Sequence, residues 1–533
     1  MIKLKTYTWI TALVLVVATI SFWLMFHTFS YDNVNKQLLI SSKIYSDFAS
    51  HIPHIRSFSY GNNWPPQLPI FPGEKTRYHY LFFAVVGYLE RIGLPINLAL
   101  NIPSALGFLA LSLLIFITGS KLFSSLKVGL LSTIFFLFNG SFSFVSFFNK
   151  HPLSSNSVKE IISNVAFPSF GPWDGGPIAA FWNLNIYTNQ RHLGLSFAIA
   201  MLAIYILTTK KSQLIHLTGF LIGSLLLINQ AAFIIASAYC LWIFTTDSSK
   251  RQNILFSLFG IVPWVLIMAD TINASPTIKL NPFFLMPKPI NIFNFIKYWV
   301  LNFGIHFFLI PIGMIFSPRS AKKIIVPTLL LFIAPNVWQF SPDMINNHKL
   351  LNFYTIIGSM FSAGFLVHVW KFNPLAKLVA VIISTFLILG GIIDLFPIKN
   401  DYYIKLNDIG NNQQADFYLI HTSPSDIVLN SHWLYHPASL AGRSIYNGYS
   451  YFTWSYGYDQ TTREIFTKMI YQSESKSQAC SLLKITDINH VQLGKYHETF
   501  IHPNWKMWLS EFKPEFSDPG LGEYVYSVKE NCP

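Results

Sequence analysis

Apolar stretches recur along the first 397 positions of this chain, each roughly 16–24 residues long, near the length that a helix needs to cross the hydrocarbon core of a bilayer. Of the 533 residues, 52% are hydrophobic and 11% are charged, whereas soluble domains carry about 25% charged residues. The pattern predicts a polytopic α-helical membrane protein with about 11 transmembrane helices. We place these spans at about 8–29, 97–120, 127–148, 193–209, 212–228, 231–246, 253–270, 295–316, 324–340, 351–370 and 377–397.

The first stretch follows Lys3 and Lys5, so a signal peptide has to be considered. Its apolar core is long and aromatic, and no small-x-small cleavage site stands at its end. We therefore expect a retained membrane anchor.

Basic residues predict the orientation of the spans. If segment 79–95 lies along the interface, the cytoplasmic side collects Lys3, Lys5, Lys121, Lys127, Lys210, Lys211, Lys250, Arg251, Arg319, Lys322, Lys323, Lys371 and Lys377. If the segment spanned the bilayer, most of these residues would lie outside. We therefore expect an interfacial helix at 79–95, a multi-pass protein of the cell membrane, a cytoplasmic N-terminus and an extracytoplasmic C-terminus. Four polar regions then share the outer face: 30–96, 149–192, 341–350 and 398–533.

The net charge of +13 does not indicate a nucleic-acid partner. The Lys and Arg residues are scattered between apolar spans, as in an orientation signal. We expect no nucleic acid among the partners.

The composition changes after about residue 397, so we expect a transmembrane domain at 1–397, whose outer loop 30–96 holds interfacial helices, and a soluble extracytoplasmic α/β domain at 398–533. Short alternating or β-branched runs predict strands at 426–429, 490–493 and 524–528, and 461–471 reads as an amphipathic helix.

Cys480 and Cys532 fall in this domain. Outside the cytoplasm they could pair, and two free thiols are the alternative.

The first outer loop is the most polar part of the membrane region. It gathers a carboxylate and several cationic or titratable side chains, Asp47, His51, His54, Arg56, Arg77 and His79. If 45–59 is helical, Asp47, His51 and His54 stand at i, i+4 and i+7 on one face, although Pro53 would interrupt or start that helix. Such a face could supply a general base or part of a metal site; a polar helix face toward lipid headgroups is the alternative.

Arg77 and His79 follow a proline-rich, extended segment that begins at Trp64. A guanidinium at the membrane surface can bind a phosphate through two hydrogen-bond donors. Snorkelling of basic residues toward lipid headgroups is the alternative.

Two further outer regions carry polar groups beside a span. In 149–192 these are Asp174, in a turn-like Trp-Asp-Gly-Gly sequence, and Gln190, Arg191 and His192. In 341–354 they are Asp343, Asn347, His348 and Lys349. Together with the first loop, they indicate a lipid phosphate held at the outer leaflet beside a carboxylate.

The run DFASHIPHIRSFSYGNNWPPQLPIFPGEKTRYHYLFF resembles the first extracytoplasmic loop of GT-C superfamily glycosyltransferases, related to the dolichyl-phosphate-mannose protein mannosyltransferases. The later runs NQRHLGLSFAIAMLAIYIL and NNHKLLNFY are similar to the same group. The resemblance implies a GT-C-like fold with a C-terminal soluble domain. It also implies that Asp47 assists attack by the acceptor on a polyprenyl-phosphate-linked sugar. Many members carry paired acidic residues at this point, whereas this chain has Phe48 beside Asp47.

The resulting hypothesis is inverting transfer of a sugar from a polyprenyl-phosphate donor to a protein, lipid or glycan acceptor on the outer face. Arg77, Arg191 and Lys349 are candidates to neutralise the leaving phosphate, so no cofactor is required, although a divalent cation at Asp47, His51 and His54 stays open. The expected substrate-binding residues are His51, His54, Arg56, Arg77, His79, Asp174, Gln190, Arg191, His192, His348 and Lys349. The alternatives are an oligosaccharide ligase or polymerase with a diphosphate-linked donor, a lipid-linked sugar transporter, and a receptor.

Overall fold

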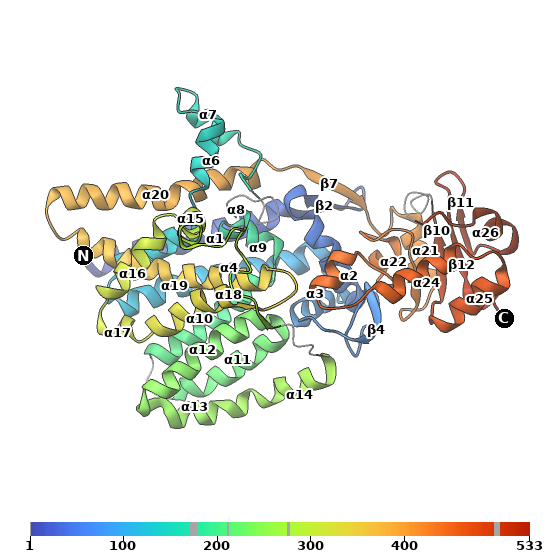
Figure 1. Cartoon of the computed structure of the whole chain (residues 1–533), viewed down its shortest axis with the longest axis horizontal. Helices are drawn as coiled ribbons and strands as arrows, with labels where there is room; N and C mark the ends of the chain where they lie inside the picture. The colour runs from blue at the N-terminus through green and yellow to red at the C-terminus, as the bar shows by residue number, and fades with distance from the viewer. Residues whose placement is uncertain (1, 170–178, 210–212, 274–277, 495–500) are drawn as a thin grey trace.

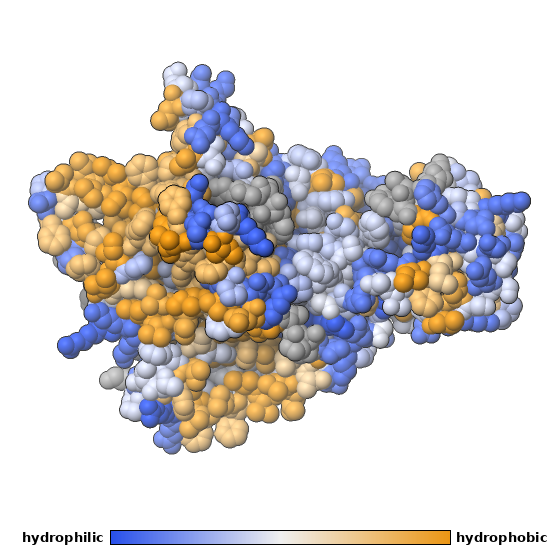
Figure 2. All heavy atoms as spheres, in the orientation of Figure 1, coloured by the Kyte–Doolittle hydropathy of each residue, from blue (hydrophilic) through white to orange (hydrophobic). Residues whose placement is uncertain are grey.

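The computed structural model describes residues 2–169, 179–209, 213–273, 278–494 and 501–533. A helical bundle forms one end of the molecule and an α/β region forms the other, with the N-terminus at the free end of the bundle (Figure 1). The visible face of the bundle is mostly hydrophobic, and that of the α/β region is mostly hydrophilic (Figure 2). A hydrophobic outer face of this kind fits a bundle that contacts lipid. The N-terminus and the α/β region lie at opposite ends, as the predicted topology requires, while their cytoplasmic and outer assignment stays a prediction.

Six helical segments in the described residues are long and apolar enough to cross a membrane, or seven if one sharply bent pair forms a single span. The six consist of α1 (Ile2–Thr28), α4 (Ile96–Leu122), the segment Ser248–Thr271 (η4 Ser248–Lys250, α13 Arg251–Ser257, η5 Leu258–Gly260, α14 Val262–Thr271), the segment Arg319–Val337 (α17 Arg319–Lys322, α18 Ile325–Val337), α19 (Ile345–Val369) and α20 (Pro374–Lys399). The bent pair is α15 (Ile292–Phe303) with α16 (His306–Ile315). Shorter apolar helices occupy the other expected spans: α5 (Leu126–Leu137), α10 (Leu193–Thr209), α11 (His216–Ile228) and α12 (Gln230–Thr246). The polytopic helical class is confirmed, and the count of about 11 spans stays a prediction.

Two expected spans end early or bend sharply. The expected span 127–148 breaks after α5, and α6 (Ser143–Lys150) and α7 (Ser157–Ile162) project sideways from the bundle (Figure 1). Gly140 lies just after the break and packs closely against α20, since a Cβ there would lie 3.1 Å from the backbone nitrogen of Gly390. The expected span 295–316 bends by 90° between α15 and α16. Gly304 ends α15 with φ +56°, a left-handed conformation that glycine adopts without the steric cost of a Cβ.

Close packing of α4 against α10 depends on two glycines. A Cβ at Gly107 would lie 2.7 Å from the nitrogen of Leu195, and one at Gly194 would lie 3.0 Å from the nitrogen of Phe108. Small residues let helix backbones approach closely in membranes. This contact fixes the start of α10 and, with it, residues 190–192, which the short helices α8 (Ala179–Trp182) and α9 (Asn185–Asn189) precede.

The first outer loop folds into a small sheet and two helices. β1 (Phe29–Asp32) and β2 (Gln37–Ser41) form an antiparallel hairpin, and β7 (Tyr403–Asn407), which follows α20, pairs antiparallel with β2. After them come α2 (Tyr45–Ser59), the β3 (Gln67–Leu68) and β4 (Phe71–Lys75) pair, and α3 (Leu81–Arg91). Helix α2 coincides with the predicted helix 45–59. Helix α3 is too short to cross a bilayer, as expected for segment 79–95.

The remaining C-terminal region forms a mixed sheet in the order β11-β12-β10-β8-β9. The predicted strands and the predicted helix 461–471 are confirmed. The strands are β8 (Ile427–Leu429), β9 (Ser444–Ile445), β10 (His490–Leu493), β11 (Phe516–Asp518) and β12 (Glu523–Ser527). The helices are α21 (Gln413–His421), α22 (Pro437–Leu440), α23 (Ser450–Ser455), α24 (Thr461–Tyr471), α25 (Lys476–Ile485), α26 (Trp505–Glu511) and α27 (Val528–Asn531). The two-residue strands β5 (Lys279–Leu280) and β6 (Trp338–Gln339) pair within the membrane part.

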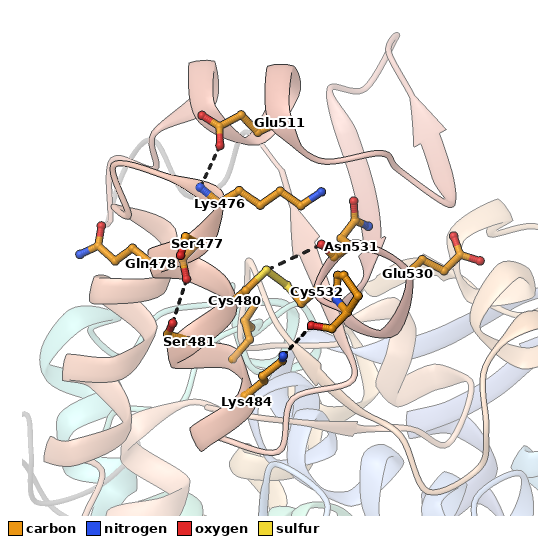
Figure 3. Close-up of a disulfide and its surroundings, with 12 residues drawn as sticks. Lys476, Ser477, Gln478, Cys480, Ser481, Lys484, Glu511, Glu530, Asn531 and Cys532 are labelled. Carbon is orange, nitrogen blue, oxygen red and sulfur yellow. Dashed lines mark hydrogen bonds between the residues drawn. A yellow bond between two sulfur atoms is a disulfide. The ribbon is translucent and has the colours of Figure 1, made fainter.

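A disulfide joins Cys480 in α25 to Cys532 near the chain end, with the two Cα atoms 5.3 Å apart (Figure 3). Beside it, the Lys484 Nζ donates a hydrogen bond to the carbonyl oxygen of Pro533. Disulfides persist in oxidising compartments. The bond therefore agrees with the expected outer location of this region.

The α/β region and the first outer loop share a hydrophobic core. Phe48 and Ile52 of α2 belong to the same buried cluster as Ala438, Leu440 and Phe452. The two backbones also meet directly: a Cβ at Gly61 would lie 2.4 Å from the carbonyl oxygen of Gly442. The expected boundary at 397/398 therefore does not separate two independent cores, because residues on both sides of it bury the same apolar surface.

Candidate active site

A polar cavity lies where the first outer loop, the segments before α10 and α19, and the α/β region meet. Six of the expected catalytic and substrate-binding residues line it together: Asp47, His51, Arg77, His79, Gln190 and Lys349. They come from three segments of the chain that are distant in sequence. Further lining side chains include Ser50, Tyr78, Asp343, Asn346, Tyr451 and Tyr456. The cavity therefore combines a carboxylate pair, two cations and several hydroxyl groups.

Asp47 stands in the first turn of α2. Burial of Asp47 raises the pKa of its carboxyl group to about 6, although a hydrogen bond from Gln190 opposes this increase. The negative charge of Asp343 also raises this pKa, and the positive charge of Lys349 lowers it. A carboxylate with a pKa near the working pH is suited to accept a proton from a reacting group.

Asp343 provides a second carboxylate, and it comes from the segment just before α19. The Tyr451 hydroxyl of α23 donates a 2.5 Å hydrogen bond to Asp343 Oδ2. Burial raises the pKa of Asp343, whereas the bond from Tyr451 and the charge of Lys349 lower it. Lys349 is buried in the first turns of α19, where its Nζ donates to Asn346 Oδ1 at 3.2 Å. The lysine is thus electrostatically coupled to both carboxylates.

Sequence reasoning did not include Asp343, Tyr451 or Tyr456 among the expected site residues. Asp343 stood in the polar group before α19, but its closeness to Lys349 was the only signal. The tyrosines stand in an aromatic-rich stretch of the α/β region. Their role depends on the contact between that region and the first loop, which no local pattern encodes.

His79 and His192 form a buried pair, with their Nε2 atoms 2.9 Å apart. Burial lowers the pKa of both imidazoles well below the usual value for histidine. Both rings are therefore neutral near pH 7, and one must donate its proton to the other. The pair fixes the orientation of His79 at the cavity wall.

His51 and His54 pack around Phe83, with ring centroids 4.9 Å and 5.3 Å from it. His51 also lines the cavity, whereas the His54 ring stacks nearly parallel on Phe83. In the described part of the chain, no three or more His, Cys, Asp or Glu residues are grouped to hold a metal ion. Asp47, His51 and His54 are thus not grouped as a metal site among these residues, and use of a divalent cation stays untested.

Arg77 reaches the cavity from the end of the proline-rich segment. Its guanidinium donates to the carbonyl oxygen of Gly457 at 2.5 Å and to Glu74 Oε2 at 3.0 Å, and it lies 4.8 Å from the Tyr458 ring centroid. Its Nε is buried and has no hydrogen-bond partner. The side chain as a whole is 23% exposed, so this cation places positive charge at the cavity wall.

Arg191 and His348 do not line the cavity. The Arg191 guanidinium is buried against α1 and α4, where it donates to Thr28 Oγ1 at 2.7 Å and to Asn101 Oδ1 at 3.1 Å. Burial lowers its pKa to about 9. The His348 ring stacks on Phe181. Asp174 lies outside the described residues.

Arg56 belongs to a separate buried ion cluster. Its guanidinium lies 2.7 Å from Asp408 Oδ2 and 3.3 Å from Glu90 Oε1. Burial lowers the pKa of Arg56, but attraction to the two carboxylates outweighs this effect and raises it. The cluster ties α2 to α3 and to the segment after β7, so the structure gives Arg56 a structural role.

No protein-family model and no curated protein matches the chain. Among solved structures, ArnT from Cupriavidus metallidurans in the apo state is similar over 98% of both chains, with a TM-score of 0.51 and 10% sequence identity. The same protein bound to undecaprenyl phosphate matches with a TM-score of 0.51, 9% identity and the same coverage. The archaeal oligosaccharyltransferase AglB from Archaeoglobus fulgidus, in complex with an inhibitory peptide and a dolichol-phosphate, gives a TM-score of 0.49 and 12% identity over 99% of this chain and 75% of AglB.

The similarity to ArnT establishes a shared fold over nearly the whole chain. The predicted overall fold is thus confirmed, while membership of the GT-C superfamily stays a prediction. The narrower relation to the dolichyl-phosphate-mannose protein mannosyltransferases stays a prediction.

Proposed function

We propose that this protein is a membrane glycosyltransferase that moves a sugar from a polyprenyl-phosphate donor to an acceptor hydroxyl, with inversion at the anomeric carbon. The observation that carries the proposal is the shared cavity of Asp47 and Lys349, a carboxylate suited to proton transfer and a buried cation. The fold shared with ArnT, one of whose structures is bound to undecaprenyl phosphate, supports a lipid-phosphate substrate.

In the proposed reaction, the acceptor oxygen attacks the anomeric carbon from the face opposite to the phosphate. A bond forms between these two atoms, and the bond from the anomeric carbon to the phosphate oxygen breaks. Asp47 takes the proton of the acceptor hydroxyl, and the pKa of about 6 keeps it ionised at neutral pH. The electron pair leaves on the phosphate, so polyprenyl phosphate is the second product.

Lys349 and Arg77 are the groups that we assign to the leaving phosphate. Both line the cavity, Lys349 is buried, and Arg77 is partly exposed. Cations held in a site with little water stabilise developing negative charge more strongly than they would in bulk solvent. Arg191, which the sequence also suggested for the leaving phosphate, instead donates hydrogen bonds to Thr28 and Asn101.

Asp343 and Tyr451 hold the two reacting groups, Asp47 and Lys349, in their working arrangement. The Asp343 charge raises the pKa of Asp47 and attracts Lys349, and the bond from Tyr451 fixes the Asp343 carboxylate. His79, oriented by His192, and Gln190, which donates to Asp47, are candidates to contact the sugar or the acceptor.

The test is to incubate the purified protein with a panel of polyprenyl-phosphate and polyprenyl-diphosphate sugars and identify the lipid products by mass spectrometry. We expect consumption of one monophosphate donor and release of polyprenyl monophosphate. Release of a lipid diphosphate would favour the ligase or polymerase alternative. Movement of intact donor across a vesicle membrane, without cleavage of any donor, would favour transport.

A further inference from the structure

A second cavity, of about 950 Å³, lies at the end of the bundle opposite the Asp47 cavity. It opens between the turn from α4 to α5, the end of α16, the last turns of α19 and the first half of α20. In Figure 1 this is the free end of the bundle, where α20 begins and the N-terminus lies. The cavity is too distant along the bundle to belong to the site described above.

The walls of this cavity are apolar and its mouth is cationic. Val128, Leu131, Val381 and Ile388 are among the wall residues, and Lys127 and Lys371 also line the cavity but are exposed, which places them at its rim. No acidic residue of the described chain lines it, and neither lysine forms an ion pair with a described residue. A ligand that suits it carries negative charge at one end and hydrocarbon at the other.

The length of the apolar wall matches one leaflet. The cavity-lining positions of α20 run from Ala380 to Ile388, a rise of about 12 Å at 1.5 Å per residue. Half of a hydrocarbon core of about 30 Å is about 15 Å. Trp370, 43% exposed, stands at the same rim as the lysines, and tryptophan favours the boundary between headgroups and hydrocarbon.

We propose that this cavity is a binding site for an anionic glycerophospholipid of the leaflet on that side. The lipid phosphate lies between Lys127 and Lys371, and an acyl chain follows the wall between α5 and α20. Basic residues attract anionic headgroups, and the apolar wall excludes a soluble anion as the natural occupant. The site is independent of the transferase reaction proposed above.

Native mass spectrometry of the full-length protein with phosphatidylglycerol, phosphatidylcholine or inorganic phosphate tests this. We expect retained phosphatidylglycerol on the wild type, little phosphatidylcholine, and no retained phosphate. The double variant Lys127→Gln/Lys371→Gln should bind phosphatidylglycerol more weakly by a factor on the order of tenfold. Lys121→Gln/Lys322→Gln is the matched control, because it removes the same charge from exposed residues of the same bundle end that do not line the cavity.

Equal binding of phosphatidylglycerol by the two double variants would overturn the proposal. Retention of inorganic phosphate with the same dependence on Lys127 and Lys371 would also overturn it, because the site would then be one for a free anion. Thr385→Trp, which fills the wall without a change in charge, should displace the lipid. Undiminished phosphatidylglycerol binding by this variant would contradict the proposed path of the acyl chain.

Discussion

The hydroxyl of Tyr451 donates a 2.5 Å hydrogen bond to Asp343, a residue 108 positions earlier in the chain. Tyr451 belongs to the α/β region, and Asp343 stands just before the membrane helix α19 that carries Lys349. The α/β region thus contributes a wall of the polar cavity and fixes the position of the Asp343 carboxylate there.

Tyr451→Phe removes this bond and should lower kcat/KM by about tenfold, because a hydrogen bond to a charged group contributes about 1.5–3 kcal/mol. Tyr449→Phe is the matched control, since Tyr449 lies two residues away and does not line the cavity. The measurement is the transfer rate together with the unfolding temperature. Equal rates for the two variants would contradict a positioning role of Tyr451.

The transfer rate should depend on pH through Asp47. The carboxylate is the active form, so kcat/KM should fall about tenfold per pH unit below a midpoint near 6 and level off above it. Asp343→Asn should move this midpoint to lower pH, because the charge of Asp343 raises the pKa of Asp47. A midpoint that stays in place after this substitution would argue that another group controls the profile.

Arg56→Met should destabilise the protein by about 3–5 kcal/mol, because it leaves Glu90 and Asp408 as buried charges without their cation. Denaturant unfolding measures this, with Arg91→Met on the exposed side of α3 as the control. Arg56→Met/Glu90→Gln/Asp408→Asn should recover part of the loss. If Arg56→Met unfolds like the wild type but loses transfer, Arg56 binds substrate after all.

The disulfide should stabilise the α/β region by about 4 kcal/mol, from the loop entropy of its 52-residue separation. Cys480→Ser should therefore lower the unfolding temperature, while Cys240→Ser, which changes the free cysteine, should leave it nearly unchanged. Thiol labelling of the denatured wild type should find one free thiol before reduction and three after it. Three free thiols before reduction would contradict the disulfide.

Much of this architecture follows from local sequence patterns. The apolar spans are encoded by composition, and helix α2 coincides with the stretch on which Asp47, His51 and His54 share a face. The breaks near Gly140 and Gly304 were missed, because hydropathy does not record where backbones must approach closely. The contacts of the cations could not be predicted either: Arg56, Arg77 and Arg191 all belong to expected outer regions, yet of the three only Arg77 lines the cavity. Buried partners such as Asp408 and Asn101, distant in sequence, decide the difference.

The central claim is that Asp47 is the base for sugar transfer to an acceptor. The most direct measurement compares the rate of polyprenyl-phosphate release by the wild type and by Asp47→Asn, with matched expression and unfolding temperature. We predict a fall of roughly 10²–10⁴-fold, the typical contribution of a general base. A release rate equal to that of the wild type in this folded variant would contradict the account.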